Sequence, residues 1–535
     1  MNQQQHTHTL DTPMLKPRLR WVSSALAMML CLLSTNLVQA QVSISIDTTQ
    51  TGPTIHRNIY GQFMEHLGRG IYEGIWVGED SKIPNTRGFR NDVVSALKDL
   101  QVPLLRWPGG CFADEYHWRD GIGPRAKRPV TINTNWGGVT DDNAFGTHEF
   151  FELADMLGSE VYINANLGTG SPREMAAWLE YMTADGQSTL AQERRKNGRD
   201  KPWRIHYWAI GNEAWGCGGT MTPEYYANLY KHYATFAKTP DDNKPIMIAS
   251  GGHTAQTEWT QTLLEQVPET WSMRMNAISH HYYTLPTGNW DKHGKALGFP
   301  ESEWFSALFN TLKIEDFIKD NLAIMDKLDP EKKVSFYIDE WGTWYDVEDG
   351  EDPGFLYQQN TIRDALIASV NLNIFHQYAE RIQMSNIAQM VNVLQAMILT
   401  DKEKMLLTPT YHVFKMYIPF QDATALPLTI SGDKGYSLGE EKIPTVSASA
   451  ARDKNGKLWL ALANTHPSAT TEVTIKTDSK IKHAKGSLLT AKAMDAHNTF
   501  SKPNKVKPEA YKRKAKNGQL VISLPAKSVM VVALD

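Results

Sequence analysis

The chain has 535 residues, of which 41% are hydrophobic, enough for a large barrel and a smaller module. Its formal net charge is only −4 and no segment resembles a nucleic-acid-binding module, which argues against a disordered chain and against a nucleic-acid partner. Its three cysteines are too few for a disulfide-rich scaffold.

The N-terminus has the pattern of a secretory signal peptide. Three basic residues between positions 16 and 20 precede the apolar run Ala25–Leu33, and Val38-Gln39-Ala40 places small residues at the usual cleavage spacing. The run is too short to cross a bilayer, and no later segment has the apolar length of a membrane span. We therefore expect residues 1–40 to be a signal peptide and the mature protein to be secreted or periplasmic.

From about residue 55 the chain alternates between strand and helix patterns. Eight short apolar runs occur at 58–63, 102–107, 161–166, 205–210, 246–250, 277–283, 334–338 and 386–391. Helical patterns lie between them at 91–100, 149–157, 172–182, 223–236 and 314–328. This alternation predicts a (β/α)8 TIM barrel over residues 55–407. Its last unit has the weakest pattern, because residues 358–397 read as mostly helical.

The remainder of the chain has the pattern of a second, all-β domain. From residue 408 onward, short alternating runs are separated by turn signals, which predicts an antiparallel β-sandwich over residues 408–535. The alternating segment Val42–Ile46 has no partner in a barrel, so residues 41–54 are expected to supply a strand to the sandwich. Residues 451–535 carry 16 Lys and Arg against six Asp and Glu. Two interpretations of this basic segment remain open. It forms an ordinary solvated surface, or it is attracted to an acidic polysaccharide or to the acidic barrel.

Two of the predicted barrel strands end in a glutamate. Tyr207–Glu213 reads YWAIGNE at the end of the fourth strand, and Phe336–Gly342 reads FYIDEWG at the end of the seventh. Functional residues of such barrels lie at the carboxyl ends of the strands, and a charge at the end of a buried strand is costly unless it has a partner or a task. Two carboxylates, one protonated and one ionised, are what the cleavage of an acetal requires. Asp339 is expected to face the opposite side from Glu340 and to be structural.

At these residues the chain resembles the α-L-arabinofuranosidases of glycoside hydrolase family 51, within the clan of retaining (β/α)8 glycosidases. The resemblance rests on motifs that occur in order along the chain: Gly61–Arg69, Arg106–Phe112, Gly211–Glu213, Ser279–Tyr283, Asp339–Trp341 and Asn386–Gln389. It covers the chain from about residue 55 to the C-terminus.

The resemblance implies a retaining exo-hydrolase that releases terminal α-L-arabinofuranosyl residues from arabinan, arabinoxylan or derived oligosaccharides, without metal or cofactor. Glu213 would be the general acid/base and Glu340 the nucleophile, with their carboxyl groups about 5–5.5 Å apart. Arg106 would hold Glu340 ionised. The other residues that it places around the sugar are Glu65, Cys111, Asn212, His281, Tyr283 and Gln389.

Three other functions remain as alternatives: an endo-β-glucanase of the same family, a metal-dependent barrel hydrolase, and a sugar-binding protein without catalysis. A metal site would require converging His and Asp ligands, and His280 and His281 point to opposite faces of their strand. Whether Cys111 and Cys217 are paired, and whether the protein assembles into oligomers, is left open by the sequence.

Overall fold

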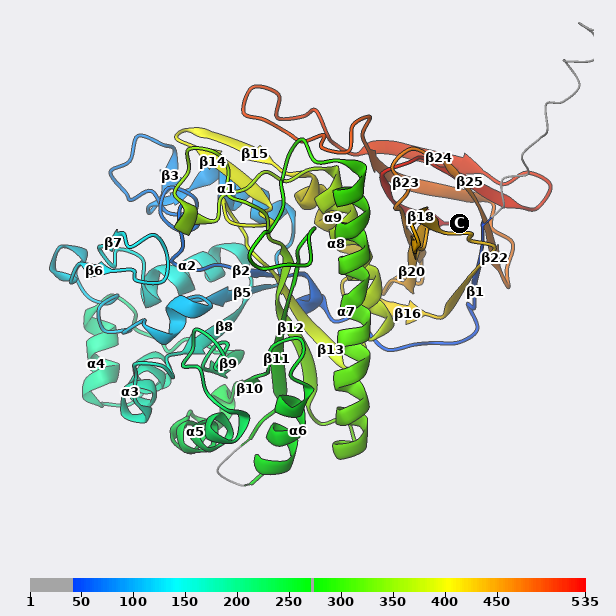
Figure 1. The fold of residues 1–535 in the computed structure, drawn as a ribbon. Coiled ribbons are helices and arrows are strands. Elements are labelled where there is room, and N and C mark those ends of the chain that lie inside the picture. The colour runs from blue at the N-terminus through cyan, green and yellow to red at the C-terminus, as the bar shows by residue number, and fades with distance from the viewer. Residues whose placement is uncertain (1–41, 271–273) are drawn as a thin grey trace, which may run out of the picture. The chain divides into compact units, whose positions relative to one another are not determined.

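The computed structural model describes residues 42–270 and 274–535, so the predicted signal peptide lies outside the described residues. Within this part of the chain, eight parallel strands close into a barrel, and two further sheets form a sandwich on one side of it (Figure 1). The predicted fold class, a (β/α)8 barrel with a C-terminal antiparallel β-sandwich, is confirmed. No helix among the described residues has the length and apolar character needed to cross a bilayer.

The barrel strands follow one another around the barrel in chain order. They are β2 (Gly61–Phe63), β5 (Leu104–Trp107), β8 (Glu160–Ala165), β9 (Tyr207–Ile210), β10 (Ile246–Ser250), β11 (Ala277–Thr284), β12 (Ser335–Thr343) and β13 (Ile382–Ile387). Inward-facing apolar side chains from these strands fill the interior, so the barrel is a packed core rather than a pore. They are Leu104, Tyr162, Tyr207, Ala209, Ile248, Ala277, Tyr337 and Met384.

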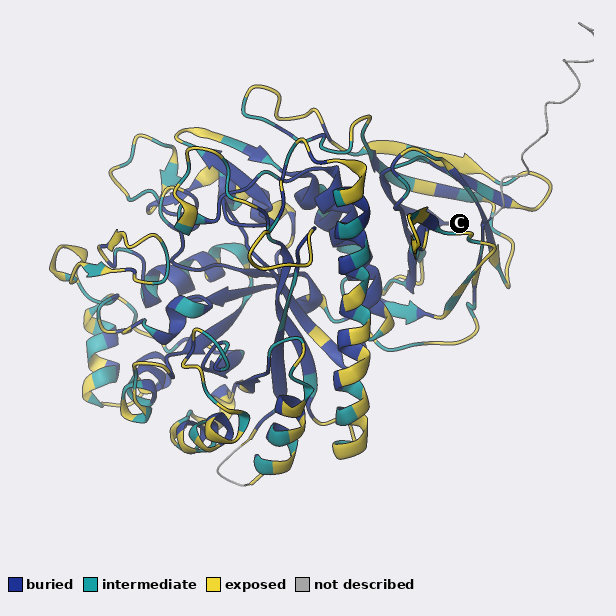
Figure 2. Ribbon diagram, viewed as in Figure 1, coloured by how far each residue is buried: buried dark blue, intermediate teal, exposed yellow. Residues whose placement is uncertain are grey.

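Helices cover the outside of the barrel. They are α1 (Asn91–Asp99), α2 (Thr147–Leu157), α3 (Pro172–Thr183), α4 (Thr189–Lys196), α5 (Pro223–Phe236), α6 (Thr257–Gln266), α7 (Glu301–Leu328), α8 (Ile362–Gln377) and α9 (Pro409–Tyr417). Helix α5 has the predicted bounds, whereas α7 begins 13 residues before the predicted position 314. The outer helices expose one face and bury the other, as the colouring of Figure 2 shows.

Two details differ from the expected order of elements. The mostly helical reading of residues 358–397 is wrong, because α8 ends at Gln377 and β13 follows. The segment after Thr408 begins with helix α9 rather than a strand: Pro409 occupies its first turn, and the Thr408 hydroxyl accepts a hydrogen bond from the Tyr411 N–H. Proline at the first helical position and threonine at the cap are both typical helix starts.

The sandwich consists of two sheets. One contains, in order, β17 (Leu428–Ser431), β1 (Val42–Ile46), β22 (Thr471–Thr477) and β25 (Leu520–Leu524). The other contains β16 (Thr424–Leu426), β20 (Val446–Arg452), β21 (Leu458–Asn464), β26 (Ser528–Leu534), β23 (His483–Thr490) and β24 (Glu509–Lys514). Pairing is antiparallel except between β1 and β22, which run parallel. Strand β1, at the start of the described chain, thus lies between two strands of the C-terminal region.

Four two-stranded ribbons complete the described strands. They are β3 (Asn85–Thr86) with β4 (Phe89–Arg90), β6 (Thr131–Ile132) with β7 (Thr140–Asp141), β14 (Ile398–Asp401) with β15 (Lys404–Leu407), and β18 (Tyr436–Leu438) with β19 (Glu441–Ile443).

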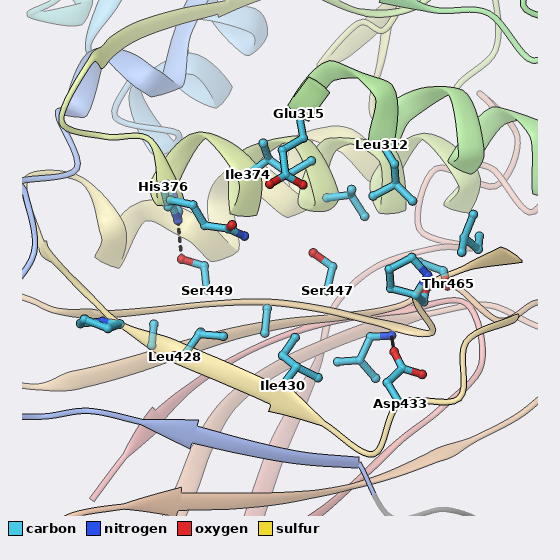
Figure 3. A pocket seen from close by; sticks show the side chains of 18 of the residues that line it. Leu312, Glu315, Ile374, His376, Leu428, Ile430, Asp433, Ser447, Ser449 and Thr465 are labelled. Carbon is cyan, nitrogen blue, oxygen red and sulfur yellow. Dashed lines mark hydrogen bonds between the residues drawn. The ribbon is translucent and has the colours of Figure 1, made fainter. Parts of the chain in front are cut away.

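Helix α8 joins the barrel to the sandwich. Every residue from Ile362 to His376 is buried, because one side of α8 packs on the barrel and the other on sandwich strands β20, β21 and β26. A cavity of about 860 Å³ lies between α7, α8 and the sandwich strands (Figure 3). Polar groups along it have partners: His376 Nδ1 lies 2.8 Å from the Ser449 hydroxyl, and the Val446 N–H donates to Asp433.

Candidate active site

The loop after β9 places Glu213 at the mouth of the barrel. Asp114 fixes this loop, because its carboxylate accepts hydrogen bonds from the N–H groups of Asn212 (2.9 Å), Leu167 (2.7 Å) and Gly168 (2.9 Å). Burial raises the pKa of Asp114 to about 7, although these N–H donors oppose the shift. Glu213 itself has φ of 40°, in the left-handed region that non-glycine residues seldom adopt. Such backbone strain at the end of a barrel strand points to a functional residue.

Strand β12 carries a β-bulge at Asp339 and Glu340. Between β11 and β12, Ser279 pairs with Tyr337 but His281 pairs with Glu340, so β12 contains one extra residue; the pairing with β13 shifts at the same place. A bulge of this kind re-aims side chains. Both Asp339 and Glu340 therefore face the inside of the barrel, and the expectation that Asp339 faces the opposite side is wrong.

Glu340 lies in the barrel mouth and is only 6% exposed. Its Oε1 accepts a hydrogen bond from Arg106 Nη1 on β5 at 2.7 Å, and its Oε2 accepts one from the Tyr283 hydroxyl on β11 at 2.8 Å. Arg106 also donates from Nη2 to Asn212 Oδ1 at 2.6 Å. A guanidinium and a phenol that both donate to one carboxylate fix its orientation.

Glu213 faces Glu340 across the mouth, and His281 lies between them. His281 Nδ1 is 2.7 Å from Glu213 Oε1 and 3.6 Å from Glu340 Oε2. One carboxylate oxygen of Glu213 and one of Glu340 lie within 4.8 Å of each other. The two glutamates that end the fourth and seventh strands thus share one site.

Three carboxylates lie around His281 and favour its protonated form. Burial alone would lower its pKa, but the carboxylates of Glu340, Asp339 and Glu213 outweigh burial and raise the pKa of His281 to about 10. In this form Nδ1 donates to Glu213 Oε1 at 2.7 Å, and Nε2 makes a longer ion-pair contact with Asp339 Oδ1 at 3.3 Å.

Glu65 is a further acidic residue that lines the site. Its Oε1 accepts hydrogen bonds from the N–H groups of Gly110 (3.0 Å) and Phe112 (3.1 Å), and its Oε2 accepts one from Gln389 Nε2 (3.1 Å). A Cβ added at Gly109 would lie 2.5 Å from the Glu65 side chain, so this turn requires glycine. Burial, together with the charge of Glu340, raises the pKa of Glu65 to about 7.

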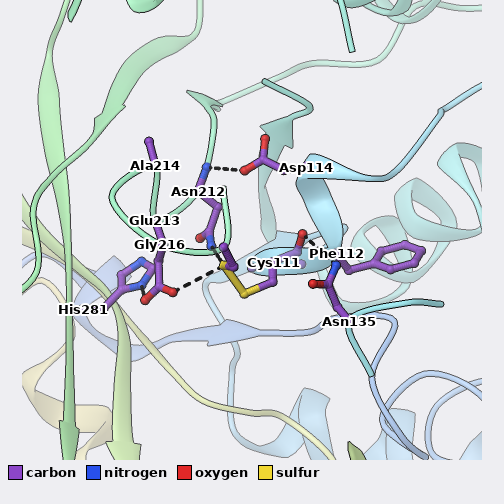
Figure 4. Close-up of a disulfide and its surroundings, with 12 residues drawn as sticks. Cys111, Phe112, Asp114, Asn135, Asn212, Glu213, Ala214, Gly216 and His281 are labelled. Atoms are coloured by element: carbon purple, nitrogen blue, oxygen red, sulfur yellow. Dashed lines mark hydrogen bonds and ion pairs between the residues drawn. A yellow bond between two sulfur atoms is a disulfide. The ribbon is translucent and has the colours of Figure 1, made fainter. Parts of the chain in front are cut away.

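Cys111 and Cys217 form a disulfide beside Glu213 (Figure 4). It ties the turn after β5 to the glycine-rich loop after β9, whose residues Gly216, Gly218 and Gly219 have little conformational restraint of their own. Cys217 Sγ lies 3.5 Å from Glu213 Oε2. The structure therefore answers the pairing question that the sequence left open.

A cavity of about 450 Å³ joins these side chains, a volume within the usual range of small-molecule sites, roughly 300–1,000 Å³. Seven of the nine predicted site residues line it: Glu65, Cys111, Glu213, His281, Tyr283, Glu340 and Gln389. Arg106 and Asn212 lie behind this lining and hold it in place, each at most 2% exposed. The sequence reasoning did not single out Trp290, His253 and Lys313, which also line the cavity. Of these only Trp290 had a usable signal, as an aromatic residue in the loop after the sixth strand.

Two groups of side chains could be considered as metal ligands. Glu213, His281 and Glu340 present ligand atoms within 4.8 Å of one another, as do Cys111, Glu213 and Cys217. A metal requires a neutral imidazole and free thiolates. Cys111 and Cys217 are joined, so the second group offers no free thiolate.

Comparison with known proteins agrees with this geometry. Residues 96–296 match the family described as "Alpha-L-arabinofuranosidase 1 domain", and residues 339–528 match "Alpha-L-arabinofuranosidase C-terminal domain". The chain is 49% identical to an "Intracellular exo-alpha-L-arabinofuranosidase" of Bacteroides ovatus, over 93% of this chain and 96% of that protein. It is 31% identical to alpha-L-arabinofuranosidase C of Emericella nidulans, over 80% of this chain and 86% of that one.

A solved structure gives the same result at the level of the fold. The crystal structure of the GH51 arabinofuranosidase of Xanthomonas axonopodis pv. citri superposes with a TM-score of 0.90 at 49% identity, covering 92% of this chain and all of that one.

The predicted secreted or periplasmic location is corrected by these comparisons, because the Bacteroides ovatus relative at 49% identity is named as an intracellular enzyme. The prediction rested on a local pattern of basic residues followed by a short apolar run. That pattern falls within residues 1–40, outside the described part of the chain.

Two family matches, a near-complete alignment at 49% identity and the superposed barrel and sandwich lead to one conclusion: the chain belongs to the α-L-arabinofuranosidases of glycoside hydrolase family 51.

Proposed function

We propose that this arabinofuranosidase releases terminal α-L-arabinofuranosyl residues from arabinan, arabinoxylan or derived oligosaccharides by a retaining double displacement. The observation that carries the proposal is the approach of Glu213 and Glu340, with carboxylate oxygens within 4.8 Å across one cavity. Carboxyl groups about 5–5.5 Å apart are typical of retaining glycosidases, whereas inverting enzymes need about 6.5–9.5 Å to admit a water.

In the first step, the Glu340 carboxylate attacks the anomeric carbon, the bond from that carbon to the glycosidic oxygen breaks, and Glu213 gives its proton to the leaving oxygen. In the second step, water attacks the same carbon, Glu213 takes the proton from that water, and Glu340 leaves. The contacts support this assignment. Glu340 has Arg106 and Tyr283 as donors, whereas the Glu213 side chain is 18% exposed, more than the 7% of Glu340, and can exchange protons with leaving group and water.

The sugar-binding roles are supported by hydrogen-bonding groups that remain available in the cavity. Gln389 Oε1 is buried and has no hydrogen-bond partner among the described residues, so it can accept from a furanose hydroxyl. Asn212, directly behind the lining, uses its carbonyl for Arg106, and its amide nitrogen makes only a weak 3.9 Å contact with Cys217 Sγ, so it can still donate to the sugar 2-hydroxyl. Glu65 borders the same space and can bind further hydroxyls, and the Cys111–Cys217 disulfide forms part of the wall.

The exo mode is supported by the shape and rim of the site. Trp136, Trp290 and Trp344 line the same compact cavity as the two glutamates. A pocket suits the removal of one terminal sugar, whereas an endo-β-glucanase needs an open cleft for a chain that passes through. The word "exo" in the name of the Bacteroides ovatus relative also agrees with this mode.

Kinetics of Glu340→Ala and Glu213→Ala on an activated aryl arabinofuranoside test the proposal. Glu340→Ala should have lost nearly all turnover. Glu213→Ala should keep measurable glycosylation, because an activated leaving group needs little protonation, and added azide should restore turnover and give an arabinofuranosyl azide of retained configuration.

The matched control is Glu224→Ala, which removes an exposed glutamate in the first turn of α5 and should leave activity unchanged. Normal turnover by Glu340→Ala, or an azide product of inverted configuration from Glu213→Ala, would contradict the mechanism.

A further inference from the structure

Behind the two glutamates lies a carboxylate for which the mechanism above has no task. Asp339 is fully buried, and it faces the barrel interior because of the bulge in β12. Its Oδ2 accepts a hydrogen bond from the Tyr162 hydroxyl on β8 at 2.6 Å and lies 3.3 Å from Arg106 Nε. Its Oδ1 lies 3.3 Å from His281 Nε2. One carboxylate therefore lies against two cations that come from different strands.

Each of those cations also holds one of the proposed reacting carboxylates. Arg106 uses Nε toward Asp339 and Nη1 toward Glu340, and His281 uses Nε2 toward Asp339 and Nδ1 toward Glu213. A planar guanidinium or imidazole that is bound on one edge has a fixed orientation on the other edge. Asp339 is thus linked to Glu340 through Arg106 and to Glu213 through His281.

We infer that Asp339 is a positioning residue, which through Arg106 and His281 holds Glu340 and Glu213 together in their reactive geometry. The inference rests on the function proposed above. It replaces the expectation of a merely structural aspartate.

The charges of the cluster support the same role. Arg106 and His281 are buried cations, and burying two cations side by side is costly without anions between them. Burial would raise the pKa of Asp339, but Arg106 and His281 outweigh burial and lower it, so Asp339 is ionised throughout the working range. Its permanent charge contributes to keeping His281 protonated, together with Glu340 and Glu213. Glu340 and Glu213 change their bonding or protonation during turnover, whereas Asp339 does not.

The test is Asp339→Asn in the full-length chain, with kcat and KM measured on an activated aryl arabinofuranoside. Asparagine has nearly the same shape and can still accept from Tyr162, but it removes the charge that faces both cations. We expect kcat to fall about 100-fold, the cost of a reacting group displaced by about 1 Å. KM should stay within about threefold, because Asp339 does not line the sugar cavity.

A double-mutant cycle with His281→Gln separates positioning from general stability. If Asp339 acts partly through His281, Asp339→Asn should cost clearly less in the His281→Gln background than in the wild type. Equal losses in both backgrounds would overturn this part of the inference, and a kcat for Asp339→Asn within about threefold of wild type would overturn all of it.

Asp364→Asn is the matched control. Asp364 is also fully buried and accepts hydrogen bonds from Thr343 and Tyr345, both at 2.8 Å, but it does not contact the two cations. Its substitution should lower the thermal unfolding midpoint and leave kcat per folded molecule within about threefold. An equal loss of kcat in Asp364→Asn would show that any buried charge here has the same effect and would overturn the inference.

Tyr162→Phe decides the question if Asp339→Asn does not fold. It removes only the 2.6 Å hydrogen bond to Asp339 and leaves every charge in place. The inference predicts a several-fold loss of kcat at unchanged KM, and an unchanged kcat would overturn it. Failure of this inference is distinct from failure of the proposed function: normal kcat in Asp339→Asn with an inactive Glu340→Ala removes the positioning role alone.

Discussion

Tyr282 and Tyr283 are neighbours on β11 whose hydroxyls point in different directions. The Tyr283 hydroxyl donates to Glu340 Oε2 at 2.8 Å, whereas the Tyr282 hydroxyl donates to the backbone carbonyl of Asn310 at 2.5 Å. Hydrogen bonds to a charged group contribute roughly 1.5–3 kcal/mol, so only the first of them bears on the orientation of the proposed nucleophile.

Tyr283→Phe should therefore lower kcat by roughly 10–100-fold, the equivalent of that hydrogen bond. Tyr282→Phe is its matched control, and should lower stability by about 1 kcal/mol while kcat stays within about threefold. Both variants should be measured on the same aryl arabinofuranoside, with unfolding followed by circular dichroism. Similar kcat values for the two variants would argue against a specific role of Tyr283.

Glu65 links burial in the active site to the pH dependence of stability. Its pKa is raised from 4.5 to about 7 by burial and by Glu340, so the folded protein binds this proton more tightly than the unfolded chain does. Below pH 4.5 the group is protonated in both states and costs nothing. As the pH rises to about 7, the unfolded chain ionises first, and stability is lost across this window.

Glu65→Gln should remove that loss, since glutamine does not ionise. Relative to wild type, the free energy of unfolding of the variant should rise between pH 4.5 and 7 by up to about 3 kcal/mol. Urea unfolding at several pH values measures this difference. If the difference in unfolding free energy between the two proteins stays constant across this pH range, Glu65 is ionised in the folded protein throughout the range. The activity of the variant should be lower than that of the wild type at every pH.

Strand β12 shows, at the scale of one element, what the sequence could and could not predict. The apolar run 334–338 followed by Asp-Glu predicted a buried strand ending in a carboxylate, and β12 is that strand. The two-residue period of a regular strand then placed Asp339 away from the site. A bulge of one residue reverses this, and a bulge is set by the neighbouring strands β11 and β13 rather than by local sequence.

Whether the bounds of other elements could be predicted also depended on how far local sequence, rather than packing, determines them. Helix α5 begins with Thr222-Pro223 and has a regular apolar period, so its bounds could be predicted. The first half of α7 is rich in aromatic residues such as Trp304 and Phe305, which have a lower helix propensity, and it is helical because they pack against the core. The pairing of Cys111 with Cys217 depended on two loops meeting at the barrel mouth, which no spacing rule encodes.

The disulfide joins two loops that are 106 residues apart in the chain. Disulfides typically stabilise by about 2–4 kcal/mol, and loop-closure entropy places a loop of roughly 100 residues at the upper end, about 4–5 kcal/mol. Cys217→Ser and Cys111→Ser should both be destabilised by about this amount and should unfold alike. Dithiothreitol should lower the unfolding midpoint of the wild type and leave that of both variants unchanged. A wild type that does not respond to the reductant would show that the two sulfurs are not joined in solution.

At the scale of the whole molecule, barrel and sandwich depend on each other through α8. The sequence predicted both domains from their patterns, with a boundary at residue 407, but gave no sign of how they depend on each other. In the structure α8 is buried all round, which is the mark of a helix inside a core, and the sandwich strands cover its outer side. Strand β1, from the start of the described chain, pairs with β17 and β22 and so completes one sheet of the sandwich.

A chain truncated after residue 407 should therefore not yield a soluble, active barrel, because it would expose the outer side of α8. The full-length protein should unfold in one cooperative transition by calorimetry, with barrel and sandwich unfolding together. Two separate transitions, or an active protein ending at residue 407, would contradict this dependence.

The central claim is that Glu340 becomes covalently bonded to the sugar while Glu213 moves the proton. A 2-fluoro arabinofuranoside with a good leaving group tests it most directly, because the fluorine slows the second step more than the activated first step and lets the intermediate accumulate. Digestion and mass spectrometry of the trapped protein should find one fluoroarabinosyl group on the peptide that contains Asp339-Glu340-Trp341, attached at Glu340. An adduct on Glu213, or an enzyme that is inhibited without any covalent adduct, would contradict the account.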